Sequence, residues 1–224
     1  PLAVNGSNYG NFYSENRLHY SIRTIAKNSL LILKPNERVK PNRFFEENVA
    51  AGGQRITMPT GSRVVSVADW WNNYKKGEHC EGAELIAAEL KEDRYSYVAS
   101  DLTPAYNSYQ YDENGESGKV RRVIRSLLYL RQQDQLIVYD KVDTLDEHYL
   151  PKWLLHTISQ PEVAGSRLLA GKDENGITES TDTVAIVHSQ NSFLRVERLL
   201  PQQGVMRIVG GKDFNYYVEV DGDE

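Results

Sequence analysis

The sequence predicts an all-β protein built as a large antiparallel β-sandwich. β-branched and aromatic runs of four to eight residues alternate with clusters of turn-forming residues along the chain. No long segment keeps the 3.6-residue apolar period of an amphipathic helix. The candidate strands are numerous enough for two stacked sheets.

The candidate strands follow one another from residue 29 onward, at 29–33, 63–68, 82–90, 94–100, 119–131, 135–142, 152–158, 182–189, 192–200 and 215–220. Segment 82–90 also contains the Glu and Ala that favour a helix, so its composition is mixed. The tetrapeptide "DENG" occurs at 112–115 and again at 173–176, and Asn-Gly accepts the positive φ angles of tight hairpins. We therefore expect a hairpin at each of these places.

The strand at 119–131, "KVRRVIRSLLYLR", has no purely apolar face. Arginine stems cover apolar surface while the guanidinium stays in water. The basic end of this strand is therefore expected on a solvated face, and lining a groove is the alternative.

Composition sets the class of protein. The chain has 224 residues, 40% hydrophobic and 25% charged, with a net charge of −5 and both signs interspersed. These values suit a globular protein and predict neither a nucleic-acid nor a membrane partner. Cys80 is the only cysteine, so an internal disulfide is excluded. We expect one domain over residues 1–224, and the start at "PLAV" suggests a piece of a longer protein.

The spacing of the residues alone gives little evidence for a catalytic, metal-binding or sugar-binding site. The histidines, His19, His79, His148, His156 and His188, show neither HxH nor HExxH spacing, so a preformed metal site is not expected. In "AAGGQR" (50–55), Gln54 and Arg55 are able to present an amide and a guanidinium to a sugar, and a purely structural loop is the equal alternative. Residues 5–21 are dense in Asn, Ser and Tyr, which suits either a sugar-binding surface or an ordinary loop.

Blocks along nearly the whole chain resemble the C-terminal β-domain of heparinase II/III-like polysaccharide lyases. They are "RTIAKNSLLILKPNE" (23–37), "GGQR" (52–55), "YSYVASDLTPAY" (95–106), "VRRVIRSLLYL" (120–130), "LIVYDKV" (136–142), "KWLLHT" (152–157), and "LLPQ" (199–202) followed by "VGG" (209–211). The resemblance implies an N-terminal α/α toroid followed by a supersandwich-like β-domain, with an acidic polysaccharide between them. It also implies β-elimination: a base removes the C5 proton of a uronate whose carboxylate has been neutralised. Most catalytic residues would then come from the toroid, and we assign none within residues 1–224.

Two positions depart from the family pattern. Zinc-containing members have an aspartate at the position of Asn5 and a histidine at that of Lys27, which bind a structural zinc together with an upstream histidine. An amide oxygen is a poor zinc ligand and a protonated lysine is none, so no zinc and no other cofactor is expected here. We expect the Lys27 ammonium to replace the metal by bonding Asn5 or backbone carbonyls. The alternative is that Lys27 binds a substrate carboxylate or sulfate.

The resemblance also implies which residues contact the sugar. Tyr9, Tyr13 and His19 lie between the two former ligand positions, where family members border the substrate, and surface tyrosines without a role are the alternative. Gln54 and Arg55 keep the family motif, although Ala50 and Ala51 replace the Asn-Asp expected before it. His156 is interpreted as a hydrogen-bonded structural histidine packed beside Trp153.

Two functions therefore follow from the sequence. The first is the β-sandwich part of a lyase acting on an acidic polysaccharide, in the periplasm or outside the cell, with its own toroid as partner; a homodimer is compatible with it. The second is a non-catalytic glycan-binding or structural module.

Overall fold

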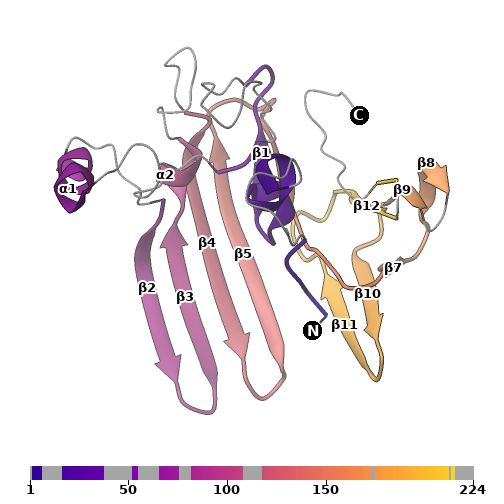
Figure 1. Ribbon diagram of the computed structural model, residues 1–224. Coiled ribbons are helices and arrows are strands. Elements are labelled where there is room, and N and C mark those ends of the chain that lie inside the picture. Colours follow the sequence, from indigo (N-terminus) through magenta and orange to yellow (C-terminus); the bar gives the residue numbers. More distant parts are fainter. Residues whose placement is uncertain are drawn as a thin grey trace. The chain divides into compact units, whose positions relative to one another are not determined.

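The structure is a computed structural model that describes residues 2–6, 17–37, 52–54, 66–75, 82–107, 118–172, 175–211 and 213–214. It is predominantly β, with several antiparallel sheets, which confirms the all-β prediction (Figure 1). The chain divides into two compact units, Leu30–Lys152 and Pro1–Ser29 with Trp153–Glu224, and each is described by itself.

A four-stranded antiparallel sheet dominates the unit Leu30–Lys152 (Figure 1). Its strands are β2 (Glu84–Lys91), β3 (Tyr95–Asp101), β4 (Val120–Leu130) and β5 (Gln135–Thr144), each paired with its neighbour in sequence. Asp93 and Asp134 take positive φ angles in the turns that close the two hairpins, a conformation that aspartate tolerates. Segment 82–90 is thus a strand, as predicted, because pairing with β3 outweighs its helical composition.

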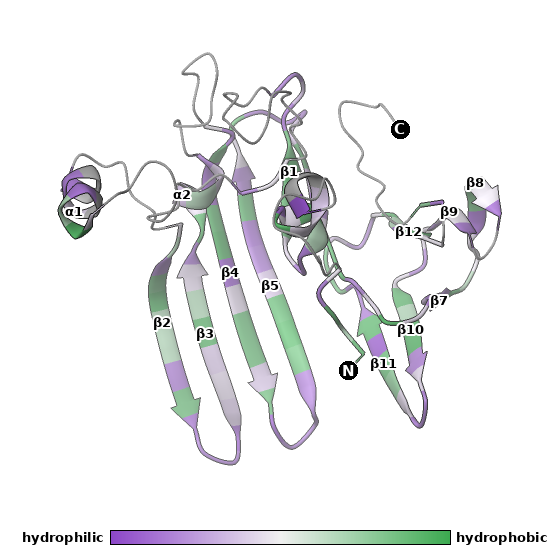
Figure 2. Cartoon of the chain, in the orientation of Figure 1, coloured by the Kyte–Doolittle hydropathy of each residue, from purple (hydrophilic) through white to green (hydrophobic). Residues whose placement is uncertain are grey.

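The register gives this sheet two different faces, because alternate residues of a strand point to opposite sides. The core face carries Val123 and Val142, with Leu127 and Val138 farther along the same strands. The tyrosine face carries Tyr95, Tyr97, Ala99, Ser126, Leu128, Ile137, Tyr139 and Lys141. Figure 2 shows hydrophobic residues gathered in the halves of β4 and β5 next to their connecting turn, with hydrophilic residues farther along β5.

A small core lies on the core face at the start of β4. Strand β1 (Leu30–Leu33), which pairs with β6 (Leu150–Trp153), and helix α2 (Thr103–Tyr106) supply most of it. The fully buried members of this cluster are Leu30, Ile32, Ala105, Tyr106, Val120 and Val123. The Tyr106 hydroxyl donates to the Leu30 carbonyl at 2.7 Å, so its one polar group is satisfied inside this core.

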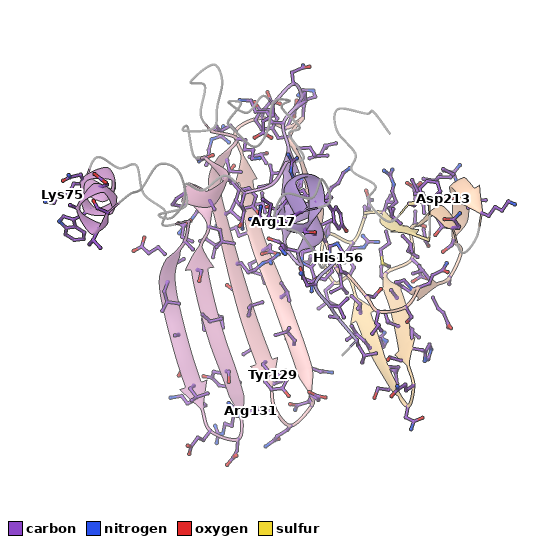
Figure 3. All side chains as sticks on the ribbon, in the orientation of Figure 1. Arg17, Lys75, Tyr129, Arg131, His156 and Asp213 are labelled. Atoms are coloured by element: carbon purple, nitrogen blue, oxygen red, sulfur yellow. The ribbon has the colours of Figure 1, made fainter. Side chains whose placement is uncertain are left out.

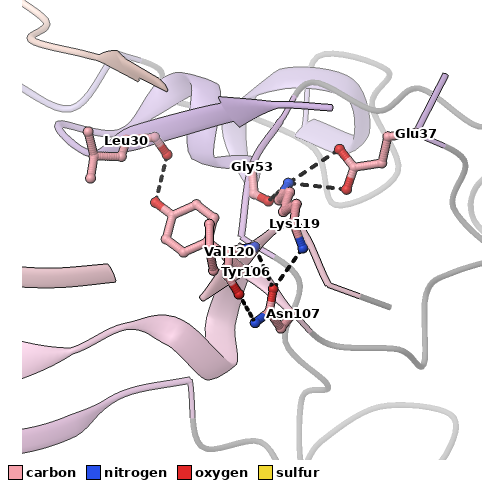
Figure 4. A network of polar contacts seen from close by, with 7 residues as sticks. All are labelled: Leu30, Glu37, Gly53, Tyr106, Asn107, Lys119 and Val120. Atoms are coloured by element: carbon pink, nitrogen blue, oxygen red, sulfur yellow. Dashed lines mark hydrogen bonds and ion pairs between the residues drawn. The ribbon is translucent and has the colours of Figure 1, made fainter. Parts of the chain in front are cut away.

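A polar network beside this core corrects one expectation (Figure 4). Lys119, predicted on a solvated face, is only 1% exposed. Its ammonium donates to Glu37 Oε1 at 3.1 Å, to Glu37 Oε2 at 3.3 Å and to the Gly53 carbonyl at 3.1 Å. Asn107 Oδ1 accepts from the backbone N–H groups of Lys119 and Val120, which fixes the start of β4. The prediction failed because the partner carboxylate lies far away in sequence.

The predicted strand at 63–68 is also wrong in its described part. Val67 and Ala68 begin helix α1 (Val67–Lys75). Ser66 Oγ accepts from the Asp69 N–H at 3.1 Å and donates to the Asp69 carboxylate at 2.8 Å, a side-chain cap that starts the helix.

In its described residues, the second unit holds two short helices and two three-stranded sheets. The helices are η1 (Arg17–Ser21) and η2 (Thr24–Ala26). One sheet has the order β11 (Ser192–Glu197), β10 (Val184–Ser189), β7 (Glu162–Val163); the other has β12 (Met206–Gly210), β9 (Asn175–Ser180), β8 (Arg167–Lys172). Strand β6 ends at Trp153, so the predicted strand 152–158 ends early, and Thr157 forms only a bridge with Ala3.

The hairpin predicted at 173–176 is present between β8 and β9. Asn175 and Gly176 lie inside β9, however, and not in its turn. A Cβ on Gly176 would stand 2.3 Å from the Ala170 carbonyl oxygen, so this glycine allows a close approach of two strands. The hairpin predicted at 112–115 and the strand predicted at 215–220 lie outside the described residues.

Within the described ranges, no helix is long and apolar enough to cross a membrane.

Candidate functional site

The candidate site lies in the unit formed by Pro1–Ser29 and Trp153–Glu224, around Asn5 and Lys27. Lys27 Nζ donates to Asn5 Oδ1 at 2.9 Å, across 22 residues of sequence. This is the contact expected from the paired departures, and it is confirmed. The backbone brings the two segments together, because the Gly6 N–H donates to the Ala26 carbonyl at 3.0 Å.

Segment 154–158 completes the site. The Val4 N–H donates to the His156 carbonyl at 3.0 Å, and the Leu154 N–H donates to the Ser29 carbonyl at 2.8 Å. His156 therefore lies beside the Asn5–Lys27 pair, and Figure 3 labels it in this unit.

The hydrogen bonds of Asn28 hold the backbone and the ring of His156 in place. Asn28 Nδ2 donates to the Val4 carbonyl, so Asn28 Oδ1 is the acceptor and takes the His156 backbone N–H at 2.8 Å. His156 Nδ1 lies 3.2 Å from the same oxygen. Nε2 lies 3.5 Å from the hydroxyl of Tyr20, which is buried.

The imidazole of His156 is held neutral. Burial lowers the pKa of His156 below its usual value, and the positive charge of Lys27 acts in the same direction. A hydrogen bond from the imidazolium to the Ile25 carbonyl opposes them without reversing the shift. Near neutral pH the imidazole of His156 is therefore uncharged.

Gly6 sets the position of the imidazole. A Cβ on Gly6 would stand 2.2 Å from His156 Cδ2 and 2.6 Å from Nε2. The ring thus packs directly on the Gly6 backbone, and any side chain there would displace it.

The site can bind an anion, and it does not fit zinc. An ammonium has three N–H donors, and in the described part of the chain Lys27 uses one of them, toward Asn5. The half-buried ammonium keeps donors for a carboxylate or a sulfate. The Asn5 amide oxygen is a poor zinc ligand and a protonated lysine is none, and no group of three or more His, Cys, Asp or Glu gathers among the described residues.

The other predicted residues are only partly placed. Tyr9, Tyr13 and Arg55 lie outside the described residues. The backbone of His19 lies in η1, next to Tyr20, and its side chain is outside what is described. Gln54 is half-buried and lies in the other unit, so the site described here does not include it.

The loop around Gln54 has a structural role. Gly52 takes φ +71°, its carbonyl accepts from the Ile32 N–H at 2.8 Å, and the Gly53 carbonyl accepts from Lys119. The two glycines of "GGQR" therefore tie this loop to β1 and to Lys119, which directly precedes β4, in agreement with the structural alternative.

Sequence reasoning missed Tyr20, Asn28 and Gly6. His156 is hydrogen-bonded, as expected, while its packing beside Trp153 stays a prediction. Tyr20 and His156 are 136 residues apart, and Asn28 and His156 are 128 apart, so no local spacing reports their contact.

No protein-family model, curated protein or solved structure matches this chain.

Proposed function

We propose that the chain is the β-sandwich part of a polysaccharide lyase that cleaves uronate-containing polysaccharide by β-elimination. In this proposal the sandwich forms one wall of the substrate cleft and an N-terminal α/α toroid forms the other. The protein acts in the periplasm or outside the cell, where such polymers occur.

The contact between Lys27 and Asn5 carries the proposal. The family resemblance assigns two ligands of one zinc ion to these positions, and ligands of one ion must lie close together. The two side chains, 22 residues apart in sequence, meet at 2.9 Å. A chance resemblance would give no reason for that contact, so the geometry supports the alignment on which the family inference depends.

Lys27 then supplies the electrostatic part of the reaction. A C5 proton becomes acidic enough to remove only when the adjacent carboxylate is neutralised, and a fixed ammonium does this most strongly where water is scarce. His156, being neutral, does not compete with Lys27 for the carboxylate. Proton removal would fall to the toroid residues that the resemblance implies.

The test uses the full-length protein with alginate, heparin-type and chondroitin-type polymers, and it measures the near-ultraviolet absorbance of unsaturated products. Lys27→Met should lower kcat/KM by about tenfold or more, as expected for the loss of a hydrogen bond to a charged group. Lys172→Met, which removes an exposed lysine of the same unit, serves as the matched control. Glycan binding without unsaturated products on any polymer would refute the lyase and favour the non-catalytic module.

A further inference from the structure

The tyrosine face of the four-stranded sheet differs from the core face in chemistry. Tyr97, Leu128 and Ile137 lie in one row across β3, β4 and β5, and Ala99, Ser126 and Tyr139 lie in the next row. Tyr139 is 54% exposed and Ile137 is 40% exposed. Aromatic and aliphatic groups therefore stand in water on this face, beside small residues.

The ring of Tyr97 leans along the sheet. Its hydroxyl donates to Ser126 Oγ at 3.4 Å, although the residue opposite Tyr97 is Leu128. To reach Ser126 the ring must pass toward the row of Ala99, which is only 4% exposed although it is small. Tyr139 stands at the β5 end of the same row. We call the surface of Tyr97, Tyr139 and the residues between them the platform.

Two cations border the platform. Lys141 follows Tyr139 on the same face of β5, and Arg122 lies on the same face of β4, two residues before Ile124, the partner of Lys141. In the part of the chain that is described, neither cation makes a hydrogen bond or an ion pair.

The nearby carboxylates are already engaged. Asp143, the cross-strand partner of Arg122, binds Arg121. Glu89, opposite Tyr97, binds Lys91, and Asp101 accepts from the Thr103 N–H. Glu84 lies on β2, three strands and about 14 Å from β5. The β5 end of the face is therefore locally positive.

We propose that this tyrosine face is a second glycan-binding surface, which takes an acidic sugar. The sugar ring would stack on Tyr139 and Tyr97 while its carboxylate meets Lys141 and Arg122. Tyrosine combines an apolar ring with a polar edge, which suits a pyranose that has apolar C–H faces and hydroxyl rims.

A covering protein layer fits this face less well. Such a layer would remove Lys141 and Arg122 from water, and the carboxylate beside them, Asp143, already binds Arg121, so the burial is costly. A glycan leaves both head groups wet. On the core face the situation is reversed, because Arg125, the cation there, is paired with Asp140 at 2.7 Å.

The choice of an acidic sugar rests on the function proposed above, whereas binding can be tested without a lyase reaction. The probes are biosensor surfaces that carry terminal β-glucuronide or, as the neutral match, terminal β-glucoside. A terminal glucuronide has no sugar leaving group at O4, so β-elimination cannot consume it. Binding of the full-length protein is measured at two salt concentrations.

Tyr139→Ala should weaken binding to both surfaces by about tenfold, because the stacking platform is lost. Lys141→Gln should weaken binding to the glucuronide alone, by about threefold, and reduce its salt dependence. Tyr129→Ala, on the opposite face, and Lys172→Gln, which removes an exposed lysine of the other unit, are the controls and should bind as the unchanged protein does.

The inference is overturned if Tyr139→Ala and Lys141→Gln bind both surfaces like the unchanged protein. It is also overturned if light scattering shows that Tyr139→Ala converts a dimer into a monomer, since the face would then be a protein interface. Lys27→Met separates the two proposals: it should abolish most lyase activity and leave surface binding intact. Intact surface binding with no lyase activity in the unchanged protein would refute the proposed function alone.

Discussion

Lys119 offers the sharpest test of how this protein is held together. Its side chain is 2% exposed and that of Glu37 is 14% exposed, and the ammonium also donates to the Gly53 carbonyl. The same ammonium lies 5.8 Å from the centre of the Tyr106 ring. Lys119→Met keeps most of the side-chain volume and removes the charge, so the cavity term is small and the electrostatic loss is isolated.

The expected loss is large because the Glu37 carboxylate stays in a poorly solvated place without its cation. Breaking a buried ion pair from one side costs about 3–5 kcal/mol. Glu37→Gln in addition removes the carboxylate charge, so the double variant should recover about 2 kcal/mol relative to the sum of the two single variants. This coupling separates the ion pair from simple packing.

The measurement is urea unfolding of the four proteins of this double-mutant cycle, followed by far-ultraviolet circular dichroism. Lys141→Met, which removes an exposed lysine of the same unit, is the control and should change the unfolding free energy by less than about 0.5 kcal/mol. Two results would refute the reasoning: a Lys119→Met variant within about 1 kcal/mol of the unchanged protein, or strictly additive single variants.

Three further predictions concern the candidate site. Gly6→Ala should displace the His156 ring and lower the unfolding free energy by about 1–3 kcal/mol, which urea unfolding measures; an unchanged midpoint would mean that the ring is not confined. Because the pKa of His156 is lowered in the folded protein from 6.5, the unfolded chain binds the proton first as pH falls below about 6.5. The stability that His156 contributes is thus complete above that pH and is lost below it, so His156→Asn should flatten the change in urea midpoint between pH 7 and pH 5. The double variant Asn5→Asp/Lys27→His should gain one zinc per full-length chain by elemental analysis, and a chain that still binds none would count against the family alignment.

Strand positions could be predicted from the sequence where a segment alternates β-branched and aromatic residues over many positions. Strands β3, β4 and β5 are such segments, and each was predicted close to its observed bounds. Strands β8, β9 and β12 were missed, because "RLLAGK" and "NGITES" are short and carry glycines inside the strand. Helix α1 was missed because its start depends on the Ser66 cap, which a reading of apolar residues overlooks.

Burial of charged residues was the hardest property to predict. Lys119 directly precedes β4 and Lys141 lies inside β5, yet Lys119 is 1% exposed and Lys141 is exposed. The difference lies in Glu37, which is 82 residues from Lys119 and reaches it only through the loop next to β1. Periodicity reports which face a residue occupies, and it does not report whether a distant chain segment covers that face.

The candidate site shows the same limit in another form. The contact between Asn5 and Lys27 can be predicted only from a family pattern that relates the two positions. No rule based on residue spacing predicts it. His156 contacts Asn28 and Tyr20, which lie 128 and 136 residues away in sequence. A tertiary hydrogen-bond network of this kind is found from coordinates, or from a family pattern that already contains it.

The two faces of the four-stranded sheet connect these observations to function. A cation that is covered by protein needs a counter-charge. Without one, no electrostatic attraction offsets the free-energy cost of removing the cation from water. Arg125 on the core face has Asp140, and Lys119 has Glu37. Lys27 and Lys141 have no carboxylate partner within the described residues, and both remain accessible to solvent. Since unpaired accessible cations are where an acidic ligand gains most, these two lysines mark the surfaces at which we expect acidic sugars to bind.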